Sequence, residues 1–121
     1  MNDSRVKLRI AALTGLLGVG LGAFGAHALQ GHLEKSGFLE TWQTAVFYHL
    51  IHAVVILVLA LVSPQRLRSA YWCIFCGIVL FCGSLYFLAL SGLTVIGAIT
   101  PLGGVALLLG WGLIFIRAPY V

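Results

Sequence analysis

Four long apolar segments, separated by short polar breaks, make up almost all of this 121-residue chain. They run over about residues 8–29, 43–62, 70–90 and 95–116. An α-helix rises about 1.5 Å per residue, so each segment is long enough to cross the roughly 30 Å of hydrocarbon in a bilayer. The sequence therefore predicts an all-α fold, an integral membrane bundle of four transmembrane helices that forms one domain over residues 1–121.

The composition excludes an ordinary soluble domain. Hydrophobic residues make up 61% of the chain and charged residues only 8%, whereas soluble domains carry about 25% charged residues. The formal charge of +4 is not a nucleic-acid-binding patch, because its residues flank the apolar segments. All three cysteines, Cys73, Cys76 and Cys82, lie in the third segment, which argues against a secreted disulfide framework.

The basic residues predict the orientation in the membrane, because lysine and arginine are enriched in cytoplasmic loops. In a four-span bundle Lys35 falls on one side, and the others fall together on the opposite side: Arg5, Lys7, Arg9, Arg66, Arg68 and Arg117. Both termini are therefore expected in the cytoplasm. Ala26-His27-Ala28 also matches a signal-peptide cleavage pattern, but the preceding apolar run is longer than a usual signal-peptide core, and the four-span interpretation is preferred.

Small residues predict how the helices pack. In a membrane, small side chains let helix backbones approach closely. The glycines expected at helix contacts are Gly18, Gly22, Gly77, Gly97 and Gly104. Pro101 lies inside the fourth segment, where its missing N–H predicts a kink.

Polar residues inside the segments predict where a site lies. His49 and His52 are three residues apart on one helical face, and ionisable groups inside a membrane are a functional-site hypothesis by default. Depths counted from the segment ends place most intramembrane polar groups in the outer half, with Glu40 above them. The predicted polar pocket comprises His27, His49, His52, Ser84, Thr100 and Glu40.

Two aromatic residues at a similar depth, Tyr86 and Trp42, are not included in the predicted polar pocket. Tyr86 is about 200° around its helix from Ser84, so it is not expected to share the pocket. Trp42 stands at the start of the second segment and is expected to be an aromatic-belt anchor at the membrane surface.

Several interpretations of the histidines remain open. Histidines on facing helices can ligate haem, and His27, His49 and His52, with Glu40, can bind a transition metal. They can also relay protons or bind an amphiphile such as a quinone or a lipid head group. A purely structural role, with hydrogen bonds between helices, is the fourth interpretation. The sequence identifies no catalytic residue, and any metal or cofactor stays unknown.

Four motifs in order resemble a known family. They are Gly22-Ala23-Phe24-Gly25-Ala26-His27-Ala28-Leu29, the run from Glu40 to Ala53, Gly83-Ser84-Leu85-Tyr86-Phe87-Leu88, and the run from Gly97 to Gly104. Together they resemble the small membrane proteins catalogued as domain of unknown function 423, to which transmembrane protein 256 of animals is similar. The resemblance implies a four-span membrane protein and no particular reaction.

The sequence thus favours a small multi-pass protein of the bacterial plasma (inner) membrane. Its expected role is that of a non-enzymatic binding or accessory subunit. Transport, proton relay, or cofactor or lipid binding at the histidine-containing pocket is the alternative. The expected partners are the lipid bilayer and either another membrane protein or further copies of the chain; nucleic acid is not expected.

Overall fold

The computed structural model describes residues 2–62 and 64–118, and four of its helical stretches are long and apolar enough to cross a membrane. These stretches are Asp3–Ala26, Leu39–Val62, Gln65–Ser91 and Thr94–Arg117. The first is helix α1 and the second is helix α3, and the short helix α2 (Gln30–Ser36) lies between them. The predicted four-span all-α fold is confirmed.

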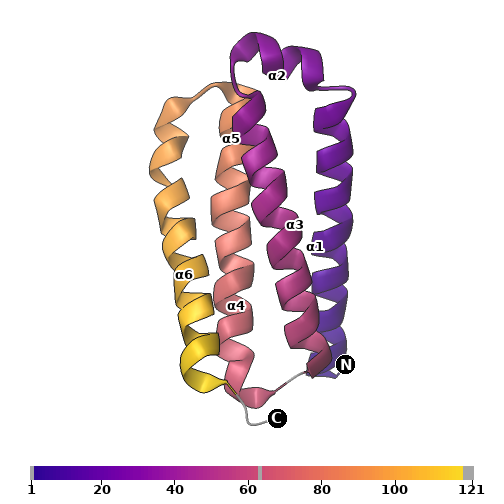
Figure 1. Cartoon of the computed structure of the whole chain (residues 1–121), viewed down its shortest axis with the longest axis vertical. Coiled ribbons are helices and arrows are strands. Elements are labelled where there is room, and N and C mark those ends of the chain that lie inside the picture. The colour runs from indigo at the N-terminus through magenta and orange to yellow at the C-terminus, as the bar shows by residue number, and fades with distance from the viewer. Residues whose placement is uncertain (1, 63, 119–121) are drawn as a thin grey trace.

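The third and fourth spans are each built from several helical pieces. The third contains a 3₁₀ turn η1 (Gln65–Leu67), α4 (Arg68–Gly77), a π-helical turn η2 (Ile78–Cys82) and α5 (Gly83–Ser91). The fourth contains a 3₁₀ turn η3 (Thr94–Ala98) and α6 (Thr100–Arg117). The four spans run side by side, α2 covers one end of the bundle, and the start of α1 and the end of α6 lie at the other end (Figure 1).

Local chemistry sets the helix ends. The Asn2 side chain accepts a hydrogen bond from the Ser4 backbone N–H and caps α1, so this helix begins before the predicted apolar segment. Gly37 follows α2 with φ 82° and Gly92 follows α5 with φ 72°. Both are left-handed conformations that glycine adopts without steric cost, and they end the helices.

Consecutive spans pack as two helical hairpins. In the first hairpin α1 lies along α3; in the second, α6 lies along α4 and η2. At the first contact, a Cβ on Gly18 would lie 2.8 Å from Leu50 Cδ2, and one on Gly22 would lie 3.1 Å from Val46 Cγ1. Gly25, a further glycine of α1, lies against the Trp42 indole. The glycines thus let α1 and α3 approach closely.

The second hairpin has a regular antiparallel register. Gly77 lies against Leu107, and a Cβ there would come within 2.6 Å of Leu107 Cδ2. The same steps of three or four residues along both helices match further pairs on either side: Ile74 with Gly110, Phe81 with Gly103, and Ser84 with Thr100. In three of these four pairs a large residue fills the space beside a glycine, which keeps the helices close.

Two of the predicted packing glycines lie elsewhere. No atom lies within 4 Å of a Cβ built on Gly97, and for Gly104 the nearest is the Phe81 ring at 3.8 Å. Gly103 and Gly110 make the close contacts of α6 instead. The prediction was wrong at these positions because spacing alone does not tell which side of a helix faces its neighbour.

Pro101 does not kink the interior of a continuous helix as predicted. It lies in the first turn of α6, after the 3₁₀ turn η3. The first N–H groups of a helix have no partner within it, so a proline there breaks no helical hydrogen bond. The irregularity of the fourth span is therefore the change from the 3₁₀ turn η3 to the α-helix α6 just before Thr100, and not a kink within a helix.

Large apolar side chains lie on the surface of the bundle as well as in its interior. Ile56, Ile74 and Tyr71 are buried between the spans, while large apolar side chains such as Leu16, Val58 and Phe115 point outward and are exposed. A helix in lipid satisfies its own backbone polar groups and can present any apolar side chain outward. This distribution fits a bundle surrounded by hydrocarbon.

Candidate functional site

His49 is a buried junction between three helices. Its Nε2 lies 2.8 Å from the Thr14 carbonyl oxygen on α1, and its Nδ1 lies 2.8 Å from the Tyr86 hydroxyl on α5. A carbonyl only accepts, so Nε2 carries the proton, and in the neutral ring the Tyr86 hydroxyl donates to Nδ1. Both ring nitrogens of His49 are therefore used by partners within the protein.

His52 makes a corresponding junction with α6, nearly one turn further along α3. The Trp111 indole N–H on α6 donates to Nε2 at 3.0 Å, and Nδ1 lies 2.8 Å from the Tyr48 carbonyl oxygen on α3 itself. Because an indole nitrogen only donates, Nε2 accepts and the ring proton lies on Nδ1. The two histidines thus have opposite tautomers, each set by its partners.

Ser84 and Thr100 form a separate pair between α5 and α6. The Ser84 hydroxyl donates to the Phe81 carbonyl at 2.9 Å, and its oxygen lies 2.7 Å from Thr100 Oγ1. Since the single Ser84 proton is used by Phe81, Thr100 is the donor. This pair lies on the α6 side of α5, whereas Tyr86 faces α3.

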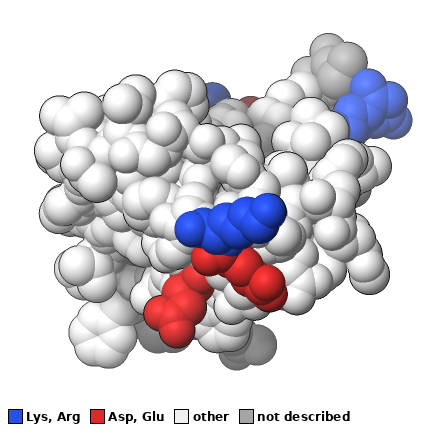
Figure 2. Space-filling view, turned by 90° about the horizontal axis from the view of Figure 1, so that it is seen from above, with Lys and Arg blue, Asp and Glu red and all other residues white. Residues whose placement is uncertain are grey.

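His27 and Glu40 lie outside these junctions. His27 follows the last residue of α1, and its backbone N–H donates to the Ala23 and Phe24 carbonyls. His27 is exposed. Glu40 is exposed in the first turn of α3. Figure 2 views the α2 end and shows acidic and basic side chains side by side; Glu34, Lys35 and Glu40 are the charged residues of this region.

The structure therefore does not bring the six predicted residues into one pocket. His49, His52 and the Ser84–Thr100 pair occupy three different helix contacts. Depth along the spans, from which the pocket was predicted, does not determine the side of the helix on which a residue lies.

Two aromatic residues have roles that the sequence interpretation missed. The roughly 200° between Ser84 and Tyr86 had excluded Tyr86, but α5 has neighbours on both sides, so both residues face inward. Trp42 is not a surface anchor: it is only 2% exposed, and its indole N–H donates to the Leu21 carbonyl at 3.0 Å. The repeated glycines of α1, which include Gly25 opposite the Trp42 indole, were the available signal.

The polar groups inside the bundle are satisfied by each other. Among the described residues, every buried side-chain nitrogen or oxygen has a hydrogen-bond partner. Residues 2–62 and 64–118 also contain no group of three or more histidine, cysteine, aspartate or glutamate side chains placed to hold a metal ion. Because both nitrogens of each ring are bonded, ligation by either histidine would require it to give up one of these hydrogen bonds.

An apolar opening, called here the lateral pocket, lies between the two hairpins. α1 packs along α3 but has little contact with α4, η2 or α5, and a cavity of about 350 Å³ remains beside it. Leu13, Leu17 and Val79 at its wall are exposed, so it opens sideways toward lipid. Its wall consists of Ile10, Leu13, Thr14, Leu17, Leu21, His49, Phe75, Ile78, Val79, Cys82, Gly83 and Tyr86.

The π-helical turn forms part of this wall. Ile78, Val79 and Cys82 of η2 line the lateral pocket, while Phe81 of the same turn packs against Gly103 on the opposite side. Single π turns within α-helices are rare and occur frequently at functional sites. The pocket wall is therefore formed at an irregular part of the third span.

Comparison with known proteins identifies relatives of this chain. The family model described as "Protein of unknown function (DUF423)" matches residues 21–104. The chain is 43% identical over 119 residues to the UPF0382 membrane protein YwdK of Bacillus subtilis (strain 168), covering 94% of this chain and 96% of that protein. A UPF0382 membrane protein of Staphylococcus aureus (strain USA300) is 41% identical over 73 residues, covering 58% of this chain and 59% of that protein. No solved structure matches.

Proposed function

This chain belongs to the DUF423 family of membrane proteins, and we propose that it is a non-enzymatic protein that binds an apolar chain of a membrane molecule in the lateral pocket. The relatives named above are bacterial membrane proteins, which supports a location in the bacterial inner membrane. The distribution of basic residues supports cytoplasmic termini. The description of the family specifies no reaction, so the proposal depends on the pocket itself.

The observation that carries the proposal is the size and lining of the lateral pocket. Its volume of about 350 Å³ lies within the range of small-molecule sites, which runs from about 300 to 1,000 Å³. Its wall on α1 extends from Ile10 to Leu21, roughly 16 Å along the helix axis. A hydrocarbon tail that enters from the bilayer fits this long, apolar, sideways-open shape.

The chemistry of the wall favours binding over catalysis. The polar groups that reach the pocket are those of Thr14, His49 and Tyr86, and the Tyr86 hydroxyl and the Thr14 backbone carbonyl hold the His49 ring in place. Nearly all remaining wall residues are apolar. Such a site recognises a ligand by its shape and hydrophobic surface.

The proton-relay alternative has weaker support. A relay needs a continuous chain of hydrogen-bonding groups, but the bonds of His49 end at a backbone carbonyl and at Tyr86. Those of His52 end at Trp111 and at a carbonyl of its own helix. Along residues 2–62 and 64–118, the hydrogen bonds therefore join helices rather than form a path across the bundle.

The proposal is tested by filling the pocket. Gly83 lines it, and no neighbouring atom lies within 4 Å of a Cβ built there, so Gly83→Leu adds an apolar side chain at the pocket wall whose first carbon has free space. Gly112 on α6 is equally unobstructed but does not line the pocket. Gly112→Leu is therefore the matched control for adding a leucine to a helix.

The measurement is native mass spectrometry of the protein purified in mild detergent, followed by identification of the bound lipids. We expect wild type and Gly112→Leu to carry one tightly bound lipid-like molecule and Gly83→Leu to lack it. Equal lipid occupancy in all three proteins would refute the proposed function. The same spectra report a second copy or a membrane-protein partner, the remaining expectation of an accessory role, as additional mass.

A further inference from the structure

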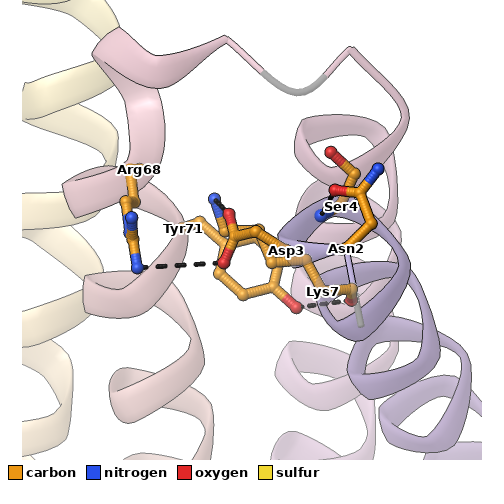
Figure 3. Close-up of polar contacts among 6 residues, drawn as sticks. All are labelled: Asn2, Asp3, Ser4, Lys7, Arg68 and Tyr71. Carbon is orange, nitrogen blue, oxygen red and sulfur yellow. Dashed lines mark hydrogen bonds and ion pairs between the residues drawn. The ribbon is translucent and has the colours of Figure 1, made fainter.

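A charged cluster joins the two hairpins beside the lateral pocket. It consists of Asp3 and Lys7 on α1 and Arg68 and Tyr71 on α4, called here the terminal cluster. In Figure 3 Tyr71 reaches from α4 toward α1, and its hydroxyl donates to the Lys7 carbonyl at 2.6 Å. The cluster therefore ties α1 to α4 at the end of the bundle where the termini lie.

The terminal cluster is the continuation of the pocket wall. On α1, Lys7 is one helical turn before Ile10, which is roughly 4.5 Å along the axis. On α4, Arg68 is about two turns before Phe75, which is roughly 10 Å. A molecule whose tail occupies the pocket would therefore have its polar end at this cluster.

The cluster carries more positive than negative charge. One carboxylate, Asp3, serves two cations, with Oδ2 at 3.0 Å from Lys7 Nζ and Oδ1 at 3.8 Å from Arg68. The Lys7 side chain is 5% exposed and its ammonium also lies 5.6 Å from the centre of the Tyr71 ring, so it is well compensated. The Arg68 side chain is 53% exposed, and within residues 2–62 and 64–118 its one ion pair is this longer contact with Asp3.

Arg68 is therefore the group suited to a further anion. A guanidinium has five N–H donors in a geometry that matches phosphate oxygens. Its position at the end of an apolar channel, in the region predicted to face the cytoplasm, matches the place of a phospholipid phosphate in that leaflet. Anionic lipids of the cytoplasmic leaflet attract basic residues that lie near the membrane surface.

We propose that the lateral pocket takes an anionic phospholipid of the leaflet next to the termini, with one acyl chain in the pocket and the phosphate on Arg68. This inference rests on the proposed function, since it names the ligand of the same pocket. Charge complementarity selects this occupant over an uncharged isoprenoid, which would offer no negative charge to the exposed guanidinium. A zwitterionic phospholipid has the same tails but no net charge, so it serves as the comparison.

The experiment is a native mass spectrometry titration with phosphatidylglycerol and phosphatidylethanolamine that have identical acyl chains. Wild type is expected to bind the anionic lipid about fivefold more tightly, as one basic residue near an anionic surface provides. Arg68→Gln is expected to remove this preference, whereas Arg68→Lys keeps the charge and should retain most of it. Arg117→Gln, which alters an exposed basic residue at the end of α6, is the matched control and should leave the preference intact.

The possible outcomes separate this inference from the proposed function. If both lipids bind equally and Gly83→Leu abolishes their binding, the pocket is a lipid site but the anionic preference is refuted. A preference that survives in Arg68→Gln also overturns the role of Arg68. If no binding depends on Gly83, the proposed function fails and this inference fails with it. Circular dichroism of each variant establishes that the helices are intact.

Discussion

The close approach of α6 to the π turn predicts that two neighbouring glycines respond oppositely to the same substitution. A Cβ on Gly103 would overlap the Phe81 backbone N and lie 2.7 Å from Phe81 Cα. A Cβ on Gly104 would meet only the Phe81 ring, at 3.8 Å. Gly103→Ala is therefore expected to destabilise the bundle and Gly104→Ala to stabilise it.

The magnitude follows from the contact. For Gly103→Ala the two backbones must separate by about 1 Å to restore ordinary contact distances, because packed interiors have no spare room. Overpacking costs about 1–3 kcal/mol, and an obstacle made of backbone places this case at the upper end. Replacing glycine by alanine within a helix, taken alone, stabilises the folded state by about 0.5–1 kcal/mol. The net loss is about 2 kcal/mol for Gly103→Ala, against a gain of about 0.5–1 kcal/mol for Gly104→Ala.

The assay is reversible unfolding in mixed micelles of mild detergent and sodium dodecyl sulfate, followed by far-ultraviolet circular dichroism. It compares the unfolding free energies of both variants with that of wild type. The expected difference between the two variants is about 3 kcal/mol. If Gly103→Ala proves as stable as Gly104→Ala, the close packing of α6 on η2 and the register of the second hairpin are wrong.

The histidine junctions give three further predictions. Tyr86→Phe leaves the buried Nδ1 of His49 without its donor and should lower the unfolding free energy by about 1–3 kcal/mol in the same assay; an unchanged value would contradict the bond. Trp111→Phe removes the donor to Nε2 of His52 and should cost a similar amount, about 1–3 kcal/mol including lost packing. Nitrogen-15 NMR of the imidazole rings should show the Nε2–H form for His49 and the Nδ1–H form for His52, and identical tautomers would argue against these partners.

The number and place of the spans were predictable because length and hydropathy are properties of each segment alone. The helix ends were less so: α1 begins at Asp3 because Asn2 caps it and ends at Ala26, before the predicted limit. The π turn over Ile78–Cys82 had no sequence signal. It lies where the third span meets Gly103 through the backbone of Phe81, a contact between separate segments.

The polar residues show the same division. That His49 and His52 have partners within the bundle was among the expected interpretations, since unpaired polar groups in lipid are costly. Their actual partners, Tyr86 and Trp111, could not be derived from depth. Pairing depends on the rotation of each helix and on which helices are neighbours. The lateral pocket likewise depends on tertiary packing, because it exists only where α1 packs along α3 and stays apart from the third span.

The division of the bundle into two hairpins has a consequence for its biogenesis. Glycine contacts act within each hairpin, between segments that are adjacent along the nascent chain. The bonds of Tyr86 to His49, of Trp111 to His52 and of Tyr71 to Lys7 all join one hairpin to the other. The first hairpin can thus form when only half of the chain has been synthesised, but it presents imidazole nitrogens to hydrocarbon until the second arrives. The second hairpin therefore supplies the donors that the buried imidazoles of the first lack on their own.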